Sequence, residues 1–173
     1  MDFGILMLRT TIGLAMAAHG SQKALGWFGG HGPDATGQFF EALGFRPGRR
    51  QALAAGWLEI LGGLSLALGF LTPLGAAVIA AVMIVAAATV HFRNGFFITG
   101  NGYELNLVLG LSALSVAFTG PGAWSIDAAL GFAPAGLAWG AGAALVAVVG
   151  AVGQLAQRHV PDAAAGTAGA PAR

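Results

Sequence analysis

The chain has 173 residues, of which 56% are hydrophobic and only 9% are charged, and its formal net charge is +1. A soluble domain of this size carries about 25% charged residues, so most of this surface must face lipid rather than water. The near-neutral charge gives no sign of nucleic-acid binding. The sequence contains no cysteine, which excludes disulfides and thiolate metal sites within this chain.

The first apolar segment covers residues 3–25. It is too long for the core of a signal peptide and no small-residue cleavage pattern follows it, so we expect a retained transmembrane helix. Its ionisable residues Arg9, His19 and Lys23 fall toward one side of a helix. That side is expected to face other helices, while the opposite side faces lipid.

Residues 26–50 connect the first two predicted helices. Pro33 and Asp34 indicate a helix start, and Phe39, Phe40 and Leu43 form a short apolar face. This pattern is typical of a segment lying flat in the headgroup region. A solvated loop with a few buried anchors explains the same pattern equally well.

Four further apolar segments are predicted to cross the membrane: residues 51–71, 74–91, 104–118 and 135–155. The first of them contains Glu59. The residues on its helical face are small, namely Ala52, Ala55, Gly56, Gly62 and Gly63. Small residues allow a neighbouring backbone to approach, so Glu59 is expected to point into the bundle, since an isolated carboxylate in lipid is very costly.

The basic residues predict the orientation. Six arginines and one lysine fall on one side of the five predicted spans: Lys23, Arg46, Arg49, Arg50, Arg93, Arg158 and Arg173. By the positive-inside rule this side is cytoplasmic, so the N-terminus is expected outside. Trp124 and Asp127, in the connector before the last span, are expected at the membrane surface.

A polar stretch, residues 91–106, separates two of the apolar segments. Helical rise places His19 about 9 Å and Glu59 about 12 Å from the cytoplasmic edge, so the two can meet. A pocket is therefore expected there, and its candidate ligand-binding residues are His19, Lys23, Glu59, His91, Asn94, Tyr103 and Glu104. Arg9 lies about 12 Å deeper than Glu59, so a structural role is expected for it. No metal site is expected.

Each candidate also has a structural interpretation. His19 could be a core histidine bonded to a backbone carbonyl, and Glu59 could pair with Lys23 or His19 to fix the helix register. Tyr103 fits an interfacial aromatic, and Asn94 precedes a glycine in a turn dipeptide. Intramembrane carboxylates are functional by default, so both interpretations of Glu59 stay open at this point.

Several motifs in order resemble the DoxX family of small bacterial membrane proteins. They are Arg9 and His19-Gly20…Lys23, Glu59…Gly62-Gly63, His91…Asn94-Gly95-Phe96-Phe97, Gly102-Tyr103-Glu104 and Gly120-Pro121-Gly122 before Ser125-Ile126-Asp127. The resemblance implies a four-helix bundle in the bacterial inner membrane and an association with quinone-linked or oxidative-stress redox systems. The chain adds a fifth apolar segment beyond the usual end of that pattern.

The expected architecture is an all-α, multi-pass membrane bundle. It has a DoxX-like four-helix core over residues 1–131, an additional transmembrane helix over 132–156 and a disordered tail over 157–173. The expected function is that of an accessory subunit of a membrane redox system, without catalysis of its own, that binds a quinone but no haem. A redox protein or a second copy of the chain is the expected partner. Two other classes remain open, a small-solute or proton carrier and a purely structural assembly partner.

Overall fold

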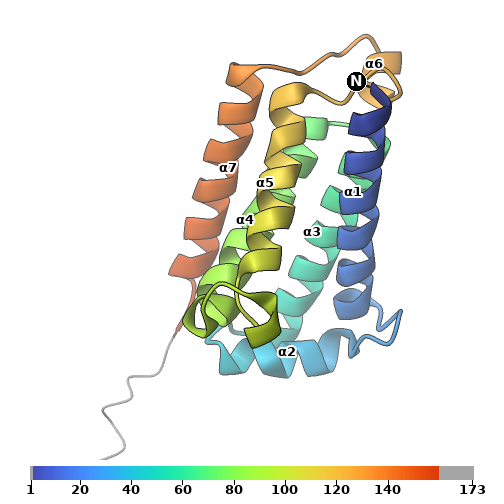
Figure 1. Ribbon diagram of the computed structural model, residues 1–173. Coiled ribbons are helices and arrows are strands. Elements are labelled where there is room, and N and C mark those ends of the chain that lie inside the picture. Colours follow the sequence, from blue (N-terminus) through green and yellow to red (C-terminus); the bar gives the residue numbers. More distant parts are fainter. Residues whose placement is uncertain (1, 160–173) are drawn as a thin grey trace, which may run out of the picture.

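The computed structural model describes residues 2–159, and the regular structure of this part of the chain is all helical. Five long helices run up and down side by side in one bundle (Figure 1). They are α1 (Asp2–Ala24), α3 (Gly48–Leu68), α4 (Thr72–Ala86), α5 (Glu104–Thr119) and α7 (Leu137–Ala156). The predicted membrane helical bundle, with a further helix at its C-terminal side, is confirmed.

Four of the helical spans are long and apolar enough to cross a membrane. α1, α3 and α7 have 23, 21 and 20 residues. α4 continues through a π-helical turn, η1 (Ala87–His91), and a 3₁₀ turn, η2 (Phe92–Asn94), into a stretch of 23 residues. About 20 residues cross the hydrocarbon core. α5 is apolar but has only 16 residues.

One end of the bundle collects the basic side chains, and we call it the basic end. α1 and α7 finish there and α3 begins there, so Lys23, Arg46, Arg49, Arg50, Arg93 and Arg158 all belong to it. A short helix, α2 (Gly32–Ala42), runs across this end (Figure 1). It starts where Pro33 predicted, with that proline in its first turn. Its position relative to the headgroups stays a prediction.

The opposite end is held together by Asp127, in the short helix α6 (Ile126–Ala129). Its carboxylate accepts hydrogen bonds from the backbone amides of Leu71 (2.8 Å) and Thr72 (2.9 Å) and from the Thr72 hydroxyl (2.7 Å). These amides begin α4 and have no partner within that helix. The Asp127 side chain is 1% exposed, whereas Trp124 is exposed, and the depth of both residues at the membrane surface stays a prediction.

Arg9 also connects segments at this end of the bundle. Its guanidinium donates hydrogen bonds to the backbone carbonyls of Ala67, in the last turn of α3, and of Trp124, in the connector before α6. Helix C-termini leave such carbonyls unpaired, so a buried arginine from a neighbouring helix satisfies them. The geometry gives Arg9 the structural position that its depth in the membrane predicted.

Two glycine pairs set the distance between α1 and α3. A Cβ atom on Gly13 would lie 2.4 Å from the carbonyl oxygen of Gly63, and one on Gly20 would lie 2.4 Å from that of Gly56. Neither position has room for a side chain. The pairs lie seven residues apart on both helices, so the two backbones are in close contact over two turns. This close packing brings α1 directly against the face of α3 that carries Glu59.

The predicted disordered tail lies mostly outside the described residues. Its first residues are described, and they contact the loop after α2. The backbone amide of His159 donates to the Gly44 carbonyl at 2.8 Å, and the Arg158 side chain donates to the Leu43 carbonyl. The end of α7 is thereby attached to the segment that covers the basic end.

Candidate functional site

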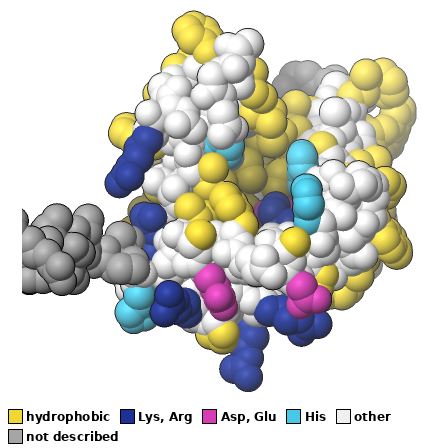
Figure 2. Space-filling model, turned by 90° about the horizontal axis from the view of Figure 1, so that it is seen from below, with side chains coloured by type: hydrophobic (Ala, Val, Ile, Leu, Met, Phe, Trp, Pro, Cys, Tyr) yellow, Lys and Arg dark blue, Asp and Glu magenta, His cyan; other side chains and the backbone are white. Residues whose placement is uncertain are grey.

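A cavity of about 730 Å³ occupies the half of the bundle nearer the basic end. All five long helices contribute to its wall, and Phe40 and Phe45, in and after α2, contribute at the basic end. Figure 2 shows the hollow from this end, with hydrophobic side chains over much of its interior. The volume and the apolar wall are typical of sites that bind small organic molecules.

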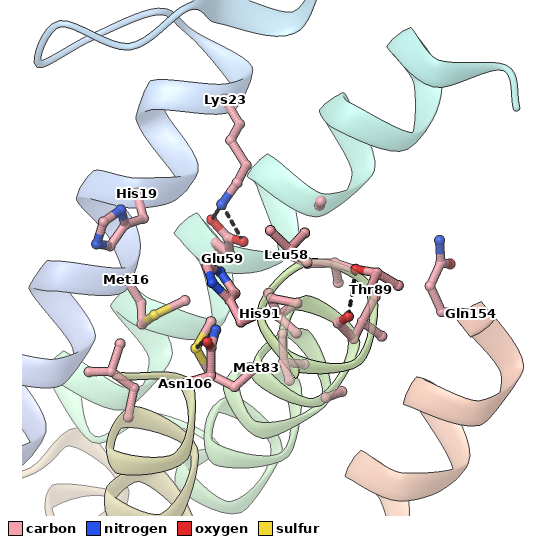
Figure 3. A pocket seen from close by; sticks show the side chains of 18 of the residues that line it. Met16, His19, Lys23, Leu58, Glu59, Met83, Thr89, His91, Asn106 and Gln154 are labelled. Atoms are coloured by element: carbon pink, nitrogen blue, oxygen red, sulfur yellow. Dashed lines mark hydrogen bonds and ion pairs between the residues drawn. The ribbon is translucent and has the colours of Figure 1, made fainter. Parts of the chain in front are cut away.

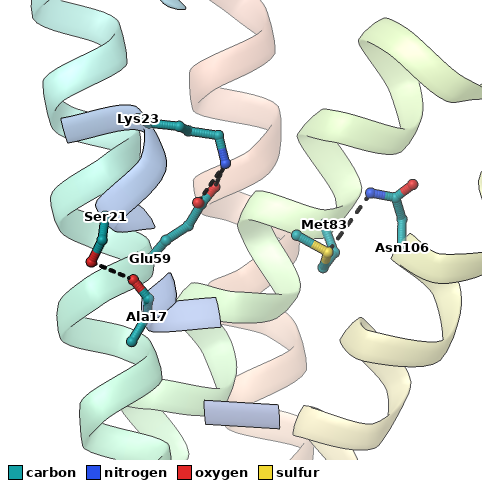
Figure 4. Close-up of polar contacts among 6 residues, drawn as sticks. All are labelled: Ala17, Ser21, Lys23, Glu59, Met83 and Asn106. Atoms are coloured by element: carbon teal, nitrogen blue, oxygen red, sulfur yellow. Dashed lines mark hydrogen bonds and ion pairs between the residues drawn. The ribbon is translucent and has the colours of Figure 1, made fainter. Parts of the chain in front are cut away.

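An ion pair lies in the wall of this cavity. The Lys23 Nζ atom lies 2.7 Å from Glu59 Oε1 and 2.5 Å from Oε2 (Figure 4). Glu59 is 1% exposed, whereas the Lys23 side chain is 29% exposed. A buried carboxylate at this depth requires a partner, and Lys23 at the end of α1 supplies it. The Lys23–Glu59 pair is one of the two pairings that the structural interpretation of Glu59 left open, the other being with His19.

His19 lies on the same helix, one turn before Lys23, and lines the cavity. Its side chain is exposed and makes no hydrogen bond within the described part of the chain. The interpretation of His19 as a core histidine bonded to a carbonyl is therefore wrong. Its ring is free to contact a molecule in the cavity or in the surrounding lipid.

His91 enters the cavity from the π-helical turn η1. Such turns insert an extra residue into a helix and are frequent at functional sites. The Nδ1 atom of His91 lies 2.8 Å from the carbonyl oxygen of Asn101. Because a carbonyl can only accept, Nδ1 carries the proton in this contact, and Nε2 of the neutral ring is left as an acceptor. Glu59 and Asn106 line the same cavity, and all three side chains are labelled in Figure 3.

Asn106 was not among the predicted ligand-binding residues. It is 8% exposed in the first turns of α5, and within the described residues its Nδ2 atom has only the Met83 sulfur as a partner, at 3.7 Å. Sulfur is a weak acceptor, so this amide can donate to a stronger one. The signal was present in the sequence, because Asn106 is the last polar residue before an apolar run.

The remaining three predicted residues, Asn94, Tyr103 and Glu104, do not line this cavity. The Asn94 amide donates to the carbonyls of Val90 and Asn101, both at 3.2 Å. The Glu104 carboxylate accepts from the Ile98 amide at 2.9 Å. These groups bond to the backbone of their own loop instead of closing the mouth of the pocket.

Tyr103 packs against aromatic rings of the same loop. Its ring stacks on Phe92 at 5.6 Å and meets Phe96 edge-on at 5.4 Å. It also borders a second, smaller groove of about 170 Å³ between α4 and α5. The predicted pocket therefore contains His19, Lys23, Glu59 and His91, whereas the other three residues stabilise the loop that carries His91.

The polar groups of the cavity offer both kinds of hydrogen bond. Lys23 and Asn106 donate, whereas the Glu59 carboxylate and Nε2 of His91 accept. Among residues 2–159, no three His, Asp or Glu side chains come together as metal ligands. A ring with carbonyl or hydroxyl oxygens and an otherwise apolar body would satisfy this set of donors and acceptors.

Comparison with known proteins places the chain among membrane proteins. It is 33% identical over 126 residues to the inner membrane protein YqjF of Escherichia coli (strain K12), which covers 73% of this chain and 91% of that protein. It is 29% identical, again over 126 residues, to a Bacillus subtilis (strain 168) protein named "Putative oxidoreductase CatD", covering 73% of this chain and 86% of the relative. No solved structure shows a significant match.

The sequence profile of one family, DoxX, matches residues 4–92. The matched region contains the first three membrane-spanning stretches and the residues Arg9, His19, Lys23, Glu59 and His91. It ends before α5 and α7 begin. This match and the identity to YqjF agree with the motifs of the sequence: the chain belongs to the DoxX family.

Proposed function

We propose that this protein binds a quinone-like molecule in its cavity and acts as an accessory subunit of a redox system in the bacterial inner membrane. The observation that carries the proposal is the buried Lys23–Glu59 ion pair in the wall of an apolar cavity of about 730 Å³. The names of the two relatives support the inner-membrane location and the link to oxidoreductases.

A quinone fits this cavity because both its oxidised and its reduced form find hydrogen-bond partners among the polar side chains. Carbonyl oxygens of the ring can accept from Lys23 and Asn106, and the hydroxyls of the reduced form can donate to Nε2 of His91 or to Glu59. The apolar body of the molecule packs against the aliphatic wall, and wherever this removes apolar surface from water it favours binding by about 25 cal/mol per Å².

The basic end is the cytoplasmic side in this proposal, because cytoplasmic loops carry an excess of Lys and Arg. The cavity then lies in the cytoplasmic half of the bilayer. Toward the other side, the bundle is filled by side chains with almost no exposed surface, among them Met16, Leu66, Ile79 and Val116. These side chains separate the cavity from the other end of the bundle in this conformation.

The test is to purify the protein in mild detergent and identify the lipid-soluble molecules and proteins that accompany it by mass spectrometry. Wild type should retain quinone, and Glu59→Gln should retain much less. Glu104→Gln is the matched control, because this carboxylate lies outside the cavity and should leave quinone retention unchanged. Wild-type protein that carries no quinone and binds none when it is added would refute the proposal.

The other two function classes give different results in the same preparations. A carrier would move protons or solute into liposomes in a manner that depends on Glu59. A structural assembly partner would bring a protein with it but no quinone, and Glu59→Gln would leave that association unchanged.

A further inference from the structure

The cavity is divided chemically along its length. The polar side chains gather where α1, α3, η1 and α5 meet, around Lys23 and Glu59. The part between α3, α4 and α7 is aliphatic, with Leu58, Ala81, Val85 and Val146 among its wall residues. Figure 3 shows this separation, since the polar side chains lie together and Gln154 lies apart, beside α7.

α7 lines the aliphatic part with a regular stripe. Val146, Gly150 and Gln154 follow each other at intervals of four residues, so they lie on one face of the helix. The neighbouring face, with Ala143, Ala147 and Ala151, is buried in the bundle. At the basic end, the Gln154 amide donates to the side-chain oxygen of Gln51 on α3 at 3.0 Å and links the two walls.

The aliphatic part of the cavity, between α3, α4 and α7, is called the groove from here on. It has room for a ligand and is open to the side. A Cβ atom on Gly150 would meet only the Ala81 methyl group, at 3.8 Å, which is an ordinary contact. Leu58 and Val146 are 48% and 54% exposed, so this part of the wall opens toward lipid. A flexible apolar chain could therefore lie between α3, α4 and α7 and leave the protein there.

We propose that α7 forms the wall of a channel for an apolar tail, so that the ligand is an isoprenoid quinone whose ring contacts Lys23 and Glu59. The inference rests on the proposed function and adds to it, because it assigns a role to the helix that lies beyond the part of the chain matched by the family profile. The polar groups bind the ring, and the stripe on α7 selects for the tail.

The test compares two probes that share one ring, a benzoquinone without a tail and the same benzoquinone with two isoprene units. Binding is measured with protein in lipid nanodiscs. Gly150→Leu should weaken binding of the tailed probe by about tenfold or more, because the leucine side chain occupies the space that the tail needs and overpacks the groove when the tail is bound. It should leave the tail-less probe unchanged. Glu59→Gln should weaken both probes.

Gly153→Leu is the matched control. It lies on the same helix and outside the cavity wall, and its Cβ would meet no atom within 4 Å. It should bind both probes as the wild type does. Val146→Phe adds volume at an exposed position of the groove and repeats the test if Gly150→Leu does not fold.

Two other outcomes would count against the inference, for different reasons. If groove variants that fold bind both probes like the wild type, the tail does not lie along α7, although the ring site stands. If the wild type binds neither probe, the proposed function fails, and the tail channel fails with it.

Discussion

Replacing Lys23 by Met should destabilise the protein much more than replacing Glu59 by Gln. Glu59 is 1% exposed and has Lys23 as its ion-pair partner, so Lys23→Met leaves a buried carboxylate without a cation. Breaking a buried pair in this way costs about 3–5 kcal/mol. Glu59→Gln should destabilise the protein less, because it leaves Lys23 without its partner and the Lys23 side chain is already 29% exposed and can turn toward water. We expect about 1 kcal/mol for Glu59→Gln.

The double variant tests the pairing directly. With Gln at residue 59, no buried charge remains to be compensated, so adding Lys23→Met should cost little more. The coupling energy between the two sites should therefore be about 3 kcal/mol or more, nearly the whole effect of Lys23→Met alone. The free energy of unfolding can be measured by titrating dodecyl sulfate into mixed micelles and following tryptophan fluorescence, since the chain has four tryptophans.

The exposed ion pair between Arg49 and Asp34, with side chains 63% and 78% exposed, is the natural control. Arg49→Met should change the free energy of unfolding by less than about 1 kcal/mol. Equal effects of Lys23→Met and Glu59→Gln, or additivity in the double variant, would show that the carboxylate does not depend on this lysine for its burial.

Three further predictions follow from other parts of the fold. Gly20→Ala should lower the free energy of unfolding by about 1–3 kcal/mol, because its Cβ would lie 2.4 Å from the Gly56 carbonyl oxygen. Gly4→Ala is the control in the same helix, and it should not lower the free energy of unfolding because its Cβ would have no atom within 4 Å. Arg9→Leu should still insert into the membrane but unfold at a lower denaturant concentration, since the carbonyls of Ala67 and Trp124 lose their donor; unchanged stability would rule out the tethering role. Reporters fused after Arg50 or after Asn101 should behave as cytoplasmic and one before Phe3 as external, and the reverse pattern would move the cavity to the outer half of the bilayer.

Helix positions and the depth of the polar groups in the bundle could be predicted from the sequence because both depend on local quantities. Apolar runs bounded by Gly, Pro and charge determine the spans, and α2 begins at the proline that indicated it. Helical rise placed His19 and Glu59 at similar depths from the same edge of the membrane, and both line the cavity. The sequence left open whether Glu59 pairs with Lys23 or with His19, and the three-dimensional structure shows the pair with Lys23. The small residues around Glu59 correctly predicted the close approach of α1.

The errors arose where a side chain had alternatives that only the three-dimensional structure decides between. Asn94 and Glu104 have the right polarity for a pocket, but carbonyls and amides of their own loop lie nearer. The hydrogen bonds of Asp127 could not be predicted, because its partners, the first amides of α4, are more than 50 residues away in the sequence. The role of α7 in the cavity wall could not be predicted either, since nothing in its alanine- and glycine-rich sequence specifies which helices it contacts.

The two glycine pairs between α1 and α3 have a mechanical consequence. Backbones that touch at Gly13–Gly63 and again at Gly20–Gly56 can neither slide nor rotate without a clash at one pair or the other. These two helices therefore form a rigid frame that holds the ion pair at constant geometry. A breathing motion that admits or releases a bulky molecule is then expected in the other long helices of the cavity wall, α4, α5 and α7. Distances measured by spin labels on introduced cysteines, in a chain that has none of its own, should fluctuate across α1–α5 and stay constant across α1–α3.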